Sequence, residues 1–495
     1  MQTAGIALAQ AMVESLARTL HAQVIETHVS WVLLTRDLAY KIKKPVHLPF
    51  VDYGTLEARR GFCEEEVRLN RRLAASLYLG VSRITGTHRI PEIDGAGTVL
   101  EYAVRMLRFA PGALFGEQLA AGALTPDAVD GLALLLGDFH ESAPATADGN
   151  GFGSAERRRA VALAALDGAA PVLDSAERDH LRDWLATQAA ALGPLWSERL
   201  ASERVRECHG DLHLDNVVSL DGGVAAFDCI EFDPALRWID VVDDIAFPVM
   251  DFGARGRSDF AFRLLNGWLD RTGDHGGMPA LRFSAVYRAL VRAQVEHLRG
   301  ADRAAAAARR FVEAALHWTQ PPSPRLVITH GLPGSGKTFQ SQRLLESEGA
   351  IRLRSDVERK RLFGLGMLED SRSHGVDLYN AQATARTYQH LFSAARSLLQ
   401  AGYPVVIDAA FLLRAERTQA LALARELQVP CAILDCQAPP EVLRQRLLAR
   451  RADASEADVA VLEKLSSLAQ PLEQGELARV RKADDGTAPT GVPTR

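Results

Sequence analysis

The sequence predicts two domains of mixed class, an α+β domain followed by an α/β domain built on a doubly wound parallel sheet. The chain has 495 residues, more than a single hydrophobic core usually organises. A proline-rich stretch at 319–324 cannot continue the helical pattern of about 301–318 and favours an extended spacer. Beyond this stretch, strand and helix patterns alternate, which is typical of a parallel sheet covered by helices. We therefore place the domains at 1–318 and 325–481, with a linker between them and a polar, disordered tail at 482–495.

Composition narrows the class of protein. Hydrophobic residues make up 47% of the chain and charged residues 24%, as in soluble globular proteins. The net charge of −5 provides no global basic field, so binding to nucleic acid or to a membrane surface gains no support. The sequence contains neither a signal-peptide pattern nor a stretch long enough to span a membrane. The five cysteines are scattered without metal-binding spacing, which indicates reduced thiols in a cytoplasmic protein.

The first domain opens with an amphipathic helix over 1–20 and a pair of strands. Residues 31–43 read as two strands around a short polar turn. Lys41 and Lys43 are two residues apart on the second strand, so both side chains point to the same face of the sheet. A further strand is predicted at 101–106.

The helix predicted at 62–75 carries three consecutive glutamates. Glu66 heads an apolar stripe at helical spacing, so its side chain faces the interior of the domain. Glu64 and Glu65 read as a solvated acidic face.

The second half of the first domain contains a polar loop followed by a predicted hairpin. Residues 217–220 and 224–227 read as two short apolar strands around a glycine-containing turn. Folding one strand back on the other brings Asn216 opposite Asp228. An amide oxygen beside a carboxylate makes an oxygen-only site that suits Mg²⁺. Asp211 lies on the same loop, five residues before Asn216.

The order of Asp211, Asn216, hairpin and Asp228 matches the catalytic and metal-binding arrangement of protein-kinase-like phosphotransferases. With a His-Gly-Asp sequence in the loop, the arrangement resembles the aminoglycoside phosphotransferase family. The resemblance implies a bilobal kinase-like domain, with a small lobe at about 1–105 and a helical large lobe at about 106–318. It also implies that Asp211 accepts the proton of an acceptor hydroxyl while Asn216 and Asp228 hold Mg²⁺.

The same resemblance implies roles in the small lobe. Residues 38–41 fit the Val-Ala-Ile-Lys pattern of the lysine that pairs with phosphates, which favours Lys41 and leaves the lysine two residues further on open. Glu66 is its expected partner. The strand at 101–106 is the candidate adenine hinge, and Asp244 is the candidate that braces the catalytic loop. No Gly-x-Gly-x-x-Gly loop precedes the strands, a departure from protein kinases that this family shares.

The second domain begins with a glycine-rich turn. A strand at 325–330 leads into the turn and a helix over 339–348 follows it, which is the context that the pattern G-x-x-x-x-G-K-[ST] requires. Backbone N–H groups of such a turn surround a polyphosphate at the positive end of the helix. Lys337 then reaches the β- and γ-phosphates, and the Thr338 hydroxyl is placed to ligate Mg²⁺. The predicted ATP-binding residues are Gly331, Leu332, Pro333, Gly334, Ser335, Gly336, Lys337 and Thr338, together with Lys41 in the first domain.

Two further strands of this domain are predicted to end in Asp356 and Asp408. The carboxyl ends of parallel strands share one edge of a sheet, so both acids should open toward the phosphates. The sequence around Asp356 resembles zeta-toxin-like kinases, in which an acid here takes the proton of the attacking hydroxyl; helix capping is the alternative. Asp408 is a Walker-B-like candidate for contact with Mg²⁺. Arg446 and Arg450 are candidates for lid arginines that reach the transferring phosphoryl group, or else belong to a solvated basic helix.

As a whole, the chain resembles bacterial bifunctional proteins that fuse an aminoglycoside-phosphotransferase-like domain to a P-loop kinase or ATPase. We expect a tandem kinase with two Mg·ATP sites, each transferring the γ-phosphoryl group to a hydroxyl of a small-molecule acceptor. Three alternatives stay open. In the first, only the P-loop domain is catalytic, and the N-terminal domain is a regulatory ligand-binding module. In the second, the protein hydrolyses ATP as a switch. In the third, the P-loop domain phosphorylates nucleic-acid ends. The absence of a basic, aromatic-rich patch argues against the last.

Overall fold

The structure, a computed structural model, describes residues 2–48, 51–146, 151–300, 302–320, 323–375, 377–378, 380–449 and 454–482. Contacts divide the chain into two compact units. The first unit contains Met1–Arg255 and Phe283–Leu316, and the second contains Gly256–Arg282 and His317–Arg495. The linker at 319–324 stays a prediction. The tail predicted at 482–495 lies outside the described residues except for Lys482, which ends a strand, β17 (Val480–Lys482).

The first unit begins with an antiparallel sheet of six strands in the order β1-β2-β3-β8-β6-β7. The strand pair predicted at 31–43 is present as β2 and β3, with Val32 opposite Lys41. The strand predicted at 101–106 is the longer β8, next to β3. The strands are β1 (Gln23–Glu26), β2 (Ser30–Leu34), β3 (Leu38–Lys43), β6 (Tyr78–Thr87), β7 (Ile90–Ile93) and β8 (Val99–Leu107), and β4 (His47–Leu48) pairs separately with β5 (Val51–Asp52).

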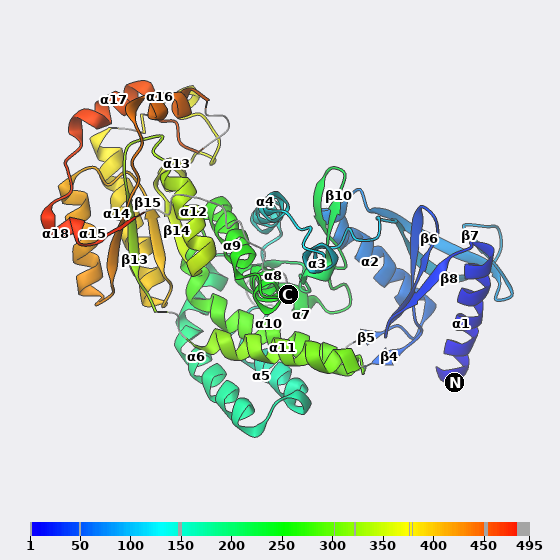
Figure 1. Ribbon diagram of the computed structural model, residues 1–495. Helices are drawn as coiled ribbons and strands as arrows, with labels where there is room; N and C mark the ends of the chain where they lie inside the picture. The colour runs from blue at the N-terminus through cyan, green and yellow to red at the C-terminus, as the bar shows by residue number, and fades with distance from the viewer. Residues whose placement is uncertain are drawn as a thin grey trace, which may run out of the picture. The chain divides into compact units, whose positions relative to one another are not determined.

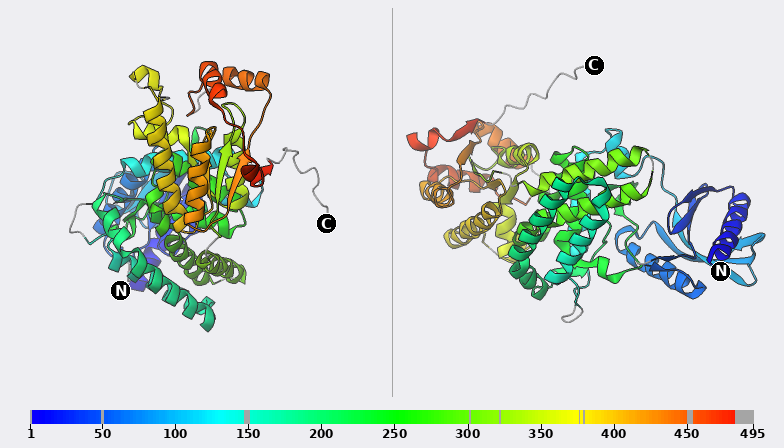
Figure 2. Two further views of the ribbon diagram at one scale, coloured as in Figure 1. Left: turned by 90° about the vertical axis from the view of Figure 1, so that its left-hand side faces the viewer. Right: turned by 90° about the horizontal axis from the view of Figure 1, so that it is seen from below.

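One helix covers each face of this sheet (Figure 2, right). The core under α1 (Gln2–Thr19) includes Ala103, and the core under α2 (Leu56–Ala74) includes the next residue, Val104. Neighbouring residues of a strand point to opposite faces, which explains the division. The side chain of Thr55 accepts a hydrogen bond from the N–H of Ala58 and caps the start of α2.

The rest of the first unit is mostly helical, as the sequence predicts. Two short antiparallel pairs interrupt it, β10 (Val217–Leu220) with β11 (Gly223–Ala226), and β9 (Val205–Glu207) with β12 (Trp238–Asp240). The helices are α3 (Phe115–Ala120), α4 (Pro126–Ser142), α5 (Ala155–Ala169), α6 (Ser175–Ala201), α7 (Pro234–Arg237), α8 (Val241–Ala254), α10 (Met278–Leu298) and α11 (Asp302–Thr319), the last two continuing from one unit into the other.

The second unit is built on a parallel sheet of five strands in the order β14-β15-β13-β16-β17, with helices on both faces (Figure 1). Its elements are β13 (Leu326–His330), α12 (Lys337–Glu348), β14 (Ile351–Arg354), α13 (Ser355–Leu362), α14 (Ala381–Gln400), β15 (Val405–Asp408), α15 (Arg414–Glu426), β16 (Cys431–Asp435), α16 (Pro440–Ala449), α17 (Val459–Leu468), α18 (Gln474–Leu477) and β17 (Val480–Lys482). The predicted fold class, an α+β part followed by a parallel α/β part, is confirmed.

One helix of the second unit comes from far upstream in the sequence. Helix α9 (Ser258–Thr272) packs on α12 and β14. The Asn266 side chain donates to the carbonyl of Ala350 (2.9 Å) and accepts from the N–H of Arg352 (2.7 Å). Because β14 is an edge strand, these two bonds satisfy backbone groups that no neighbouring strand reaches.

Among the described residues, no helix combines the length and the apolar character needed to cross a membrane.

Candidate active sites

The first candidate site gathers Lys41, Glu66 and Asp228 from three distant parts of the chain. Lys41 Nζ donates to Glu66 Oε1 over 2.9 Å and also contacts Asp228 Oδ1. Burial by itself lowers the pKa of Lys41, but the carboxylates of Asp228 and Glu66 outweigh it and raise that pKa well above its usual value. Lys41 is therefore a fixed cation beside a carboxylate that remains partly open to solvent.

Lys43 lies deeper than Lys41. Its side chain is 1% exposed, against 14% for Lys41, and Nζ donates to Glu66 Oε2 over 2.7 Å and to Glu231. The Tyr53 hydroxyl also donates to Glu231, over 2.6 Å. Glu66 thus bridges both ammonium groups, and the geometry favours Lys41 as the lysine that faces a ligand. Sequence reasoning missed Glu231, because nothing local links it to a strand 188 residues away.

The predicted catalytic loop holds Asp211 and Asn216 in contact. The amide of Asn216 donates to the backbone carbonyl of Asp211 (2.9 Å) and to its Oδ2 (3.3 Å). Burial alone would raise the pKa of the Asp211 carboxyl. The positive charges of His213 and Arg292 lower that pKa by more, so it lies below its usual range. A side chain added at Gly210 would have its Cβ 2.7 Å from the carbonyl oxygen of Leu236, so this position requires glycine. Asp211 is ionised, and its side chain is 37% exposed.

The hairpin differs by one residue from the prediction. Strand β11 covers Gly223–Ala226 rather than 224–227, because the turn uses two residues and Gly223 adopts a positive φ of 132°. Val217 therefore pairs with Ala226, and the N–H of Phe227 donates to the carbonyl of Asn216 over 3.0 Å. Asn216 is opposite Phe227 and not Asp228, which was the expectation. Asp228 follows with φ of 65°, a conformation that turns its side chain toward Lys41.

Two aspartates of helix α8 hold the catalytic loop at both ends. Asp244, the expected brace, accepts hydrogen bonds from the backbone N–H groups of His209 (3.0 Å) and Gly210 (2.9 Å) and contacts His140 (3.1 Å). Asp251, which sequence reasoning missed, accepts from the N–H of Leu214 over 2.9 Å. Its spacing of seven residues from Asp244 on one helix was the signal that could have found it.

The second candidate site is the glycine-rich turn between β13 and α12. Lys337 Nζ donates to the carbonyls of Gly331 (3.0 Å) and Leu332 (2.9 Å), so the ammonium lies within the turn. Gly331, Gly334 and Gly336 all have positive φ, and a Cβ on Gly331 would be 2.3 Å from the carbonyl oxygen of Cys436. The turn is therefore available only to glycine at these positions.

A cavity of about 1340 Å³ opens beside this turn. Its lining includes predicted residues from the glycine-rich turn, from the start of α13, from the end of β15 and from α16, namely Pro333, Gly334, Gly336, Lys337, Thr338, Asp356, Asp408 and Arg446. Asp408 ends β15 and accepts from the Ser341 hydroxyl over 3.2 Å. Strand β14 ends at Arg354, so Asp356 lies in the first turn of α13 rather than at the strand end, and it accepts from Arg359 (3.0 Å).

The predicted lid arginines are placed only in part. Arg446 Nη1 on α16 donates to the carbonyl of Gly334 over 3.0 Å, which ties this helix to the glycine-rich turn. Arg450 lies outside the described residues.

Two family models match the chain in the order of the two sites. The model of the "Phosphotransferase enzyme family" matches residues 57–283, and that of the "AAA domain" matches residues 326–472. The uncharacterized protein Rv2004c of Mycobacterium tuberculosis is 32% identical over 457 residues, which cover 90% of this chain and 89% of that protein. The uncharacterized protein Mb2027c of Mycobacterium bovis matches with the same identity and coverage.

Solved structures resemble each part separately. A choline/ethanolamine kinase family protein from Mesorhizobium loti is 12% identical, with a TM-score of 0.39, over 63% of this chain and 96% of that one. A gluconokinase from Sinorhizobium meliloti is 17% identical, with a TM-score of 0.26, over 33% of this chain and 86% of that one. The two family models show that this chain is a kinase in which a phosphotransferase domain precedes a P-loop domain of the AAA class. Because the mycobacterial relatives match 90% of its length at 32% identity, the chain belongs to their family.

Proposed function

We propose that both units are phosphotransferases that use Mg·ATP, each with its own site, and that each transfers the γ-phosphoryl group to a hydroxyl of a small molecule. The contact of Lys41 with both Glu66 and Asp228 carries this proposal for the first unit. A strand lysine that contacts both a helix glutamate and a metal-binding aspartate is what a kinase site of this type needs.

In the first site, the residues present fit a nucleotide with its metal. Asn216 and Asp228 supply oxygen ligands of the kind Mg²⁺ prefers, and Lys41 supplies the positive charge for phosphates. Bound ATP supplies the phosphoryl group. Asp211, ionised and partly exposed at the loop, orients an acceptor hydroxyl and receives its proton.

In the second site, the glycine-rich turn fits a polyphosphate because only its glycines allow the backbone to approach so closely. The cavity exceeds the roughly 300–1,000 Å³ of ordinary ligand pockets, which leaves room for an acceptor beside the nucleotide. The rings of Tyr388 and Phe392, whose centroids are 6.1 Å apart, line this cavity together with Asp356. Since Asp356 lines this cavity, we assign it the role of orienting the acceptor hydroxyl.

An acceptor screen with γ-labelled ATP tests the proposal. The protein, Asp211→Ala and Lys337→Ala are each incubated with sugars, amino alcohols and nucleosides, and labelled products are separated. We expect Asp211→Ala to remove one set of products and Lys337→Ala to remove the other. Asp221→Ala in the exposed hairpin turn and Arg425→Ala on the exposed face of α15 are the matched controls.

Two other outcomes of this screen would contradict the proposal. If Asp211→Ala retains every product, the first unit is not catalytic, and its role is that of a ligand-binding regulator. If phosphate is released at one rate whatever acceptor is added, the protein is an ATP-driven switch.

A further inference from the structure

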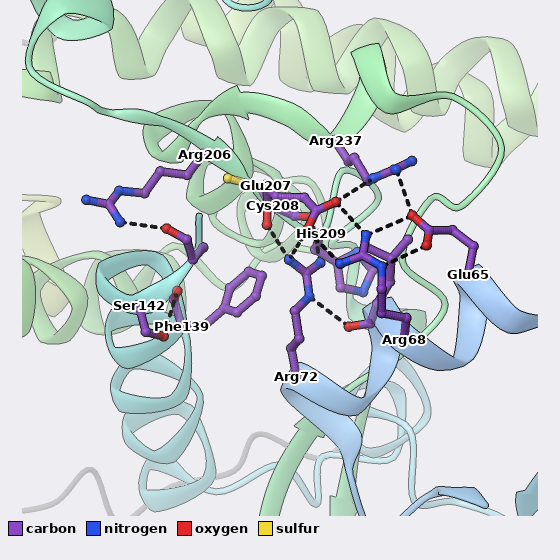
Figure 3. A network of polar contacts seen from close by, with 12 residues as sticks. Glu65, Arg68, Arg72, Phe139, Ser142, Arg206, Glu207, Cys208, His209 and Arg237 are labelled. Atoms are coloured by element: carbon purple, nitrogen blue, oxygen red, sulfur yellow. Dashed lines mark hydrogen bonds and ion pairs between the residues drawn. The ribbon is translucent and has the colours of Figure 1, made fainter. Parts of the chain in front are cut away.

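Three arginines converge on Glu207, a buried carboxylate at the end of β9 (Figure 3). Arg68 donates to it with both terminal nitrogens, over 2.7 and 3.1 Å. Arg72 donates to Oε2 over 3.2 Å, and Arg237 donates to Oε1 over 3.2 Å. The side chain of Glu207 is only 5% exposed, so water screens its contacts with the buried Arg237 and the mostly buried Arg72 less than on the surface, while Arg68 is half exposed.

The arrangement joins helix α2 to the strand that leads into the catalytic loop. Arg68 and Arg72 are one helical turn apart on α2, and Glu207 is four residues before Asp211. Arg72 also donates to the backbone carbonyls of Glu207 (2.6 Å) and Cys208 (3.3 Å). Glu65 closes the network by accepting from both Arg68 and Arg237. The contacts therefore bind the helix to the strand's backbone as well as to its side chain.

Other faces of the same helix carry two parts of the first site. Glu66 pairs with Lys41. Asn70, fully buried, accepts through Oδ1 from the N–H of Cys229, the residue after Asp228, over 2.9 Å. Helix α2 thus contacts the lysine, the metal-binding segment and the strand before the catalytic loop.

We propose that Glu207 is a positioning residue of the first site, which clamps α2 so that Glu66 and Asn70 are held in register with Asp211. The inference rests on the proposed phosphotransferase function of this site. In protein kinases, movement of the corresponding helix makes and breaks the lysine–glutamate pair. Here the clamp makes that pair a constant feature of the fold, independent of an activating partner.

A purely stabilising role would leave the position of α2 unchanged once the protein is folded. The matched control is on the same helix: Arg60 and Glu64 form an exposed pair over 2.9 Å, with side chains 46% and 54% exposed. Removing that pair changes the same chemistry on α2 without touching the strand.

The test uses the full chain with Lys337→Ala, so that the second site does not contribute. Glu207→Gln and Glu64→Gln are compared by hydrogen–deuterium exchange over α2 and by titration with a fluorescent ATP analogue. For Glu207→Gln we expect α2 to exchange about tenfold faster. We expect the dissociation constant of the analogue to rise about tenfold, because small displacements of positioning groups are costly. Glu64→Gln should stay within about twofold of the parent.

A double-variant cycle separates positioning from general weakening. If Glu207 acts by positioning α2, Glu207→Gln weakens analogue binding less in the Glu66→Gln background than in the parent, because part of its effect passes through Glu66. Additive losses overturn the proposal. So does Glu207→Gln with unchanged exchange over α2 or unchanged affinity.

Arg68→Lys covers the case in which Glu207→Gln does not fold. The Arg68 side chain is 50% exposed, and the substitution keeps its positive charge but loses the two-nitrogen contact with Glu207. We expect exchange over α2 and the dissociation constant of the analogue each to rise about threefold. If neither changes, the proposal is overturned. If the parent variant binds no analogue at all, the proposed function of the first site fails, while exchange over α2 still tests the clamp.

Discussion

At the scale of residues, burial separates two lysines that the sequence treats as equals. Lys41 and Lys43 share one face of β3, yet only Lys41 is partly exposed and contacts Asp228. Lys43 instead neutralises Glu231 beneath the site. One face of a strand therefore carries a partly exposed cation at the candidate site and a buried cation beneath it.

Substitution by methionine should affect activity at Lys41 and stability at Lys43. Lys41→Met should lower first-site kcat/KM by about 10²-fold or more, with little loss of stability, because Glu66 keeps Lys43 as its partner. Lys43→Met should lower the free energy of unfolding by about 3–5 kcal/mol, because Glu231 is left buried without its cation. Labelled-product assays and urea unfolding measure the two. Equal effects of both variants on activity would contradict the division.

The pH profile of the first site follows from Asp211. Its carboxyl pKa is lower than usual, since His213 and Arg292 outweigh the effect of burial. The active, ionised form therefore persists as the pH falls, and is lost only below the ordinary carboxyl range. With Lys337→Ala in the background, kcat/KM should be flat from about pH 8 to about pH 5.5. An acid limb near pH 6.5 would assign the base to a histidine instead.

At the scale of elements, the hairpin shows where sequence reasoning stopped. The two strands and the glycine turn were predictable because they are local patterns. The register was not, because a turn of two residues and one of three both fit the sequence, and the choice moved Asn216 from opposite Asp228 to opposite Phe227. Asp228 reaches Lys41 through its positive φ rather than through strand pairing.

The glycine-rich turn depends on one glycine that has no room for a methyl group. Gly331 has φ of 145°, and a Cβ there would also lie 2.7 Å from Ser335 Oγ. We expect Gly331→Ala to weaken ATP binding at the second site by roughly ten- to a hundredfold, the equivalent of about 1–3 kcal/mol of backbone strain. Gly475→Ala, with open space around it in the same unit, is the control. Titration in the background of Lys41→Met, which weakens nucleotide binding at the first site, reports the second site, and unchanged affinity would contradict the expectation.

At the scale of the whole molecule, the two compact units are not two consecutive segments. Residues 256–282 fold with the second unit, although the sequence assigns them to the first domain. Asp270 on α9 pairs with Arg352 on β14 over 3.2 Å, in addition to the contacts of Asn266. The P-loop sheet is thus completed at its β14 edge by a helix from upstream.

Removal of this support should weaken the second unit. Asn266→Ala leaves the carbonyl of Ala350 and the N–H of Arg352 without partners, at about 1–3 kcal/mol for each buried group. We expect lower stability of the P-loop unit in urea, and a fragment that begins at residue 323 should be weakened further. Asp259→Asn, at the partly exposed start of the same helix, is the control. A fragment as stable as the intact chain would contradict this.

The sequence alone determined the fold class, the glycine-rich turn, the polar catalytic loop and the pairing of Glu66 with a lysine. The first three are local patterns, since turn residues, strand alternation and helical spacing act over a few positions, whereas the pairing of Glu66 followed from the family resemblance. Only the tertiary structure decided which lysine faces Asp228, that Glu207 gathers three arginines, and that α9 supports the P-loop sheet. Each depends on burial and on contacts between residues far apart in the chain, and neither quantity is encoded in a local pattern.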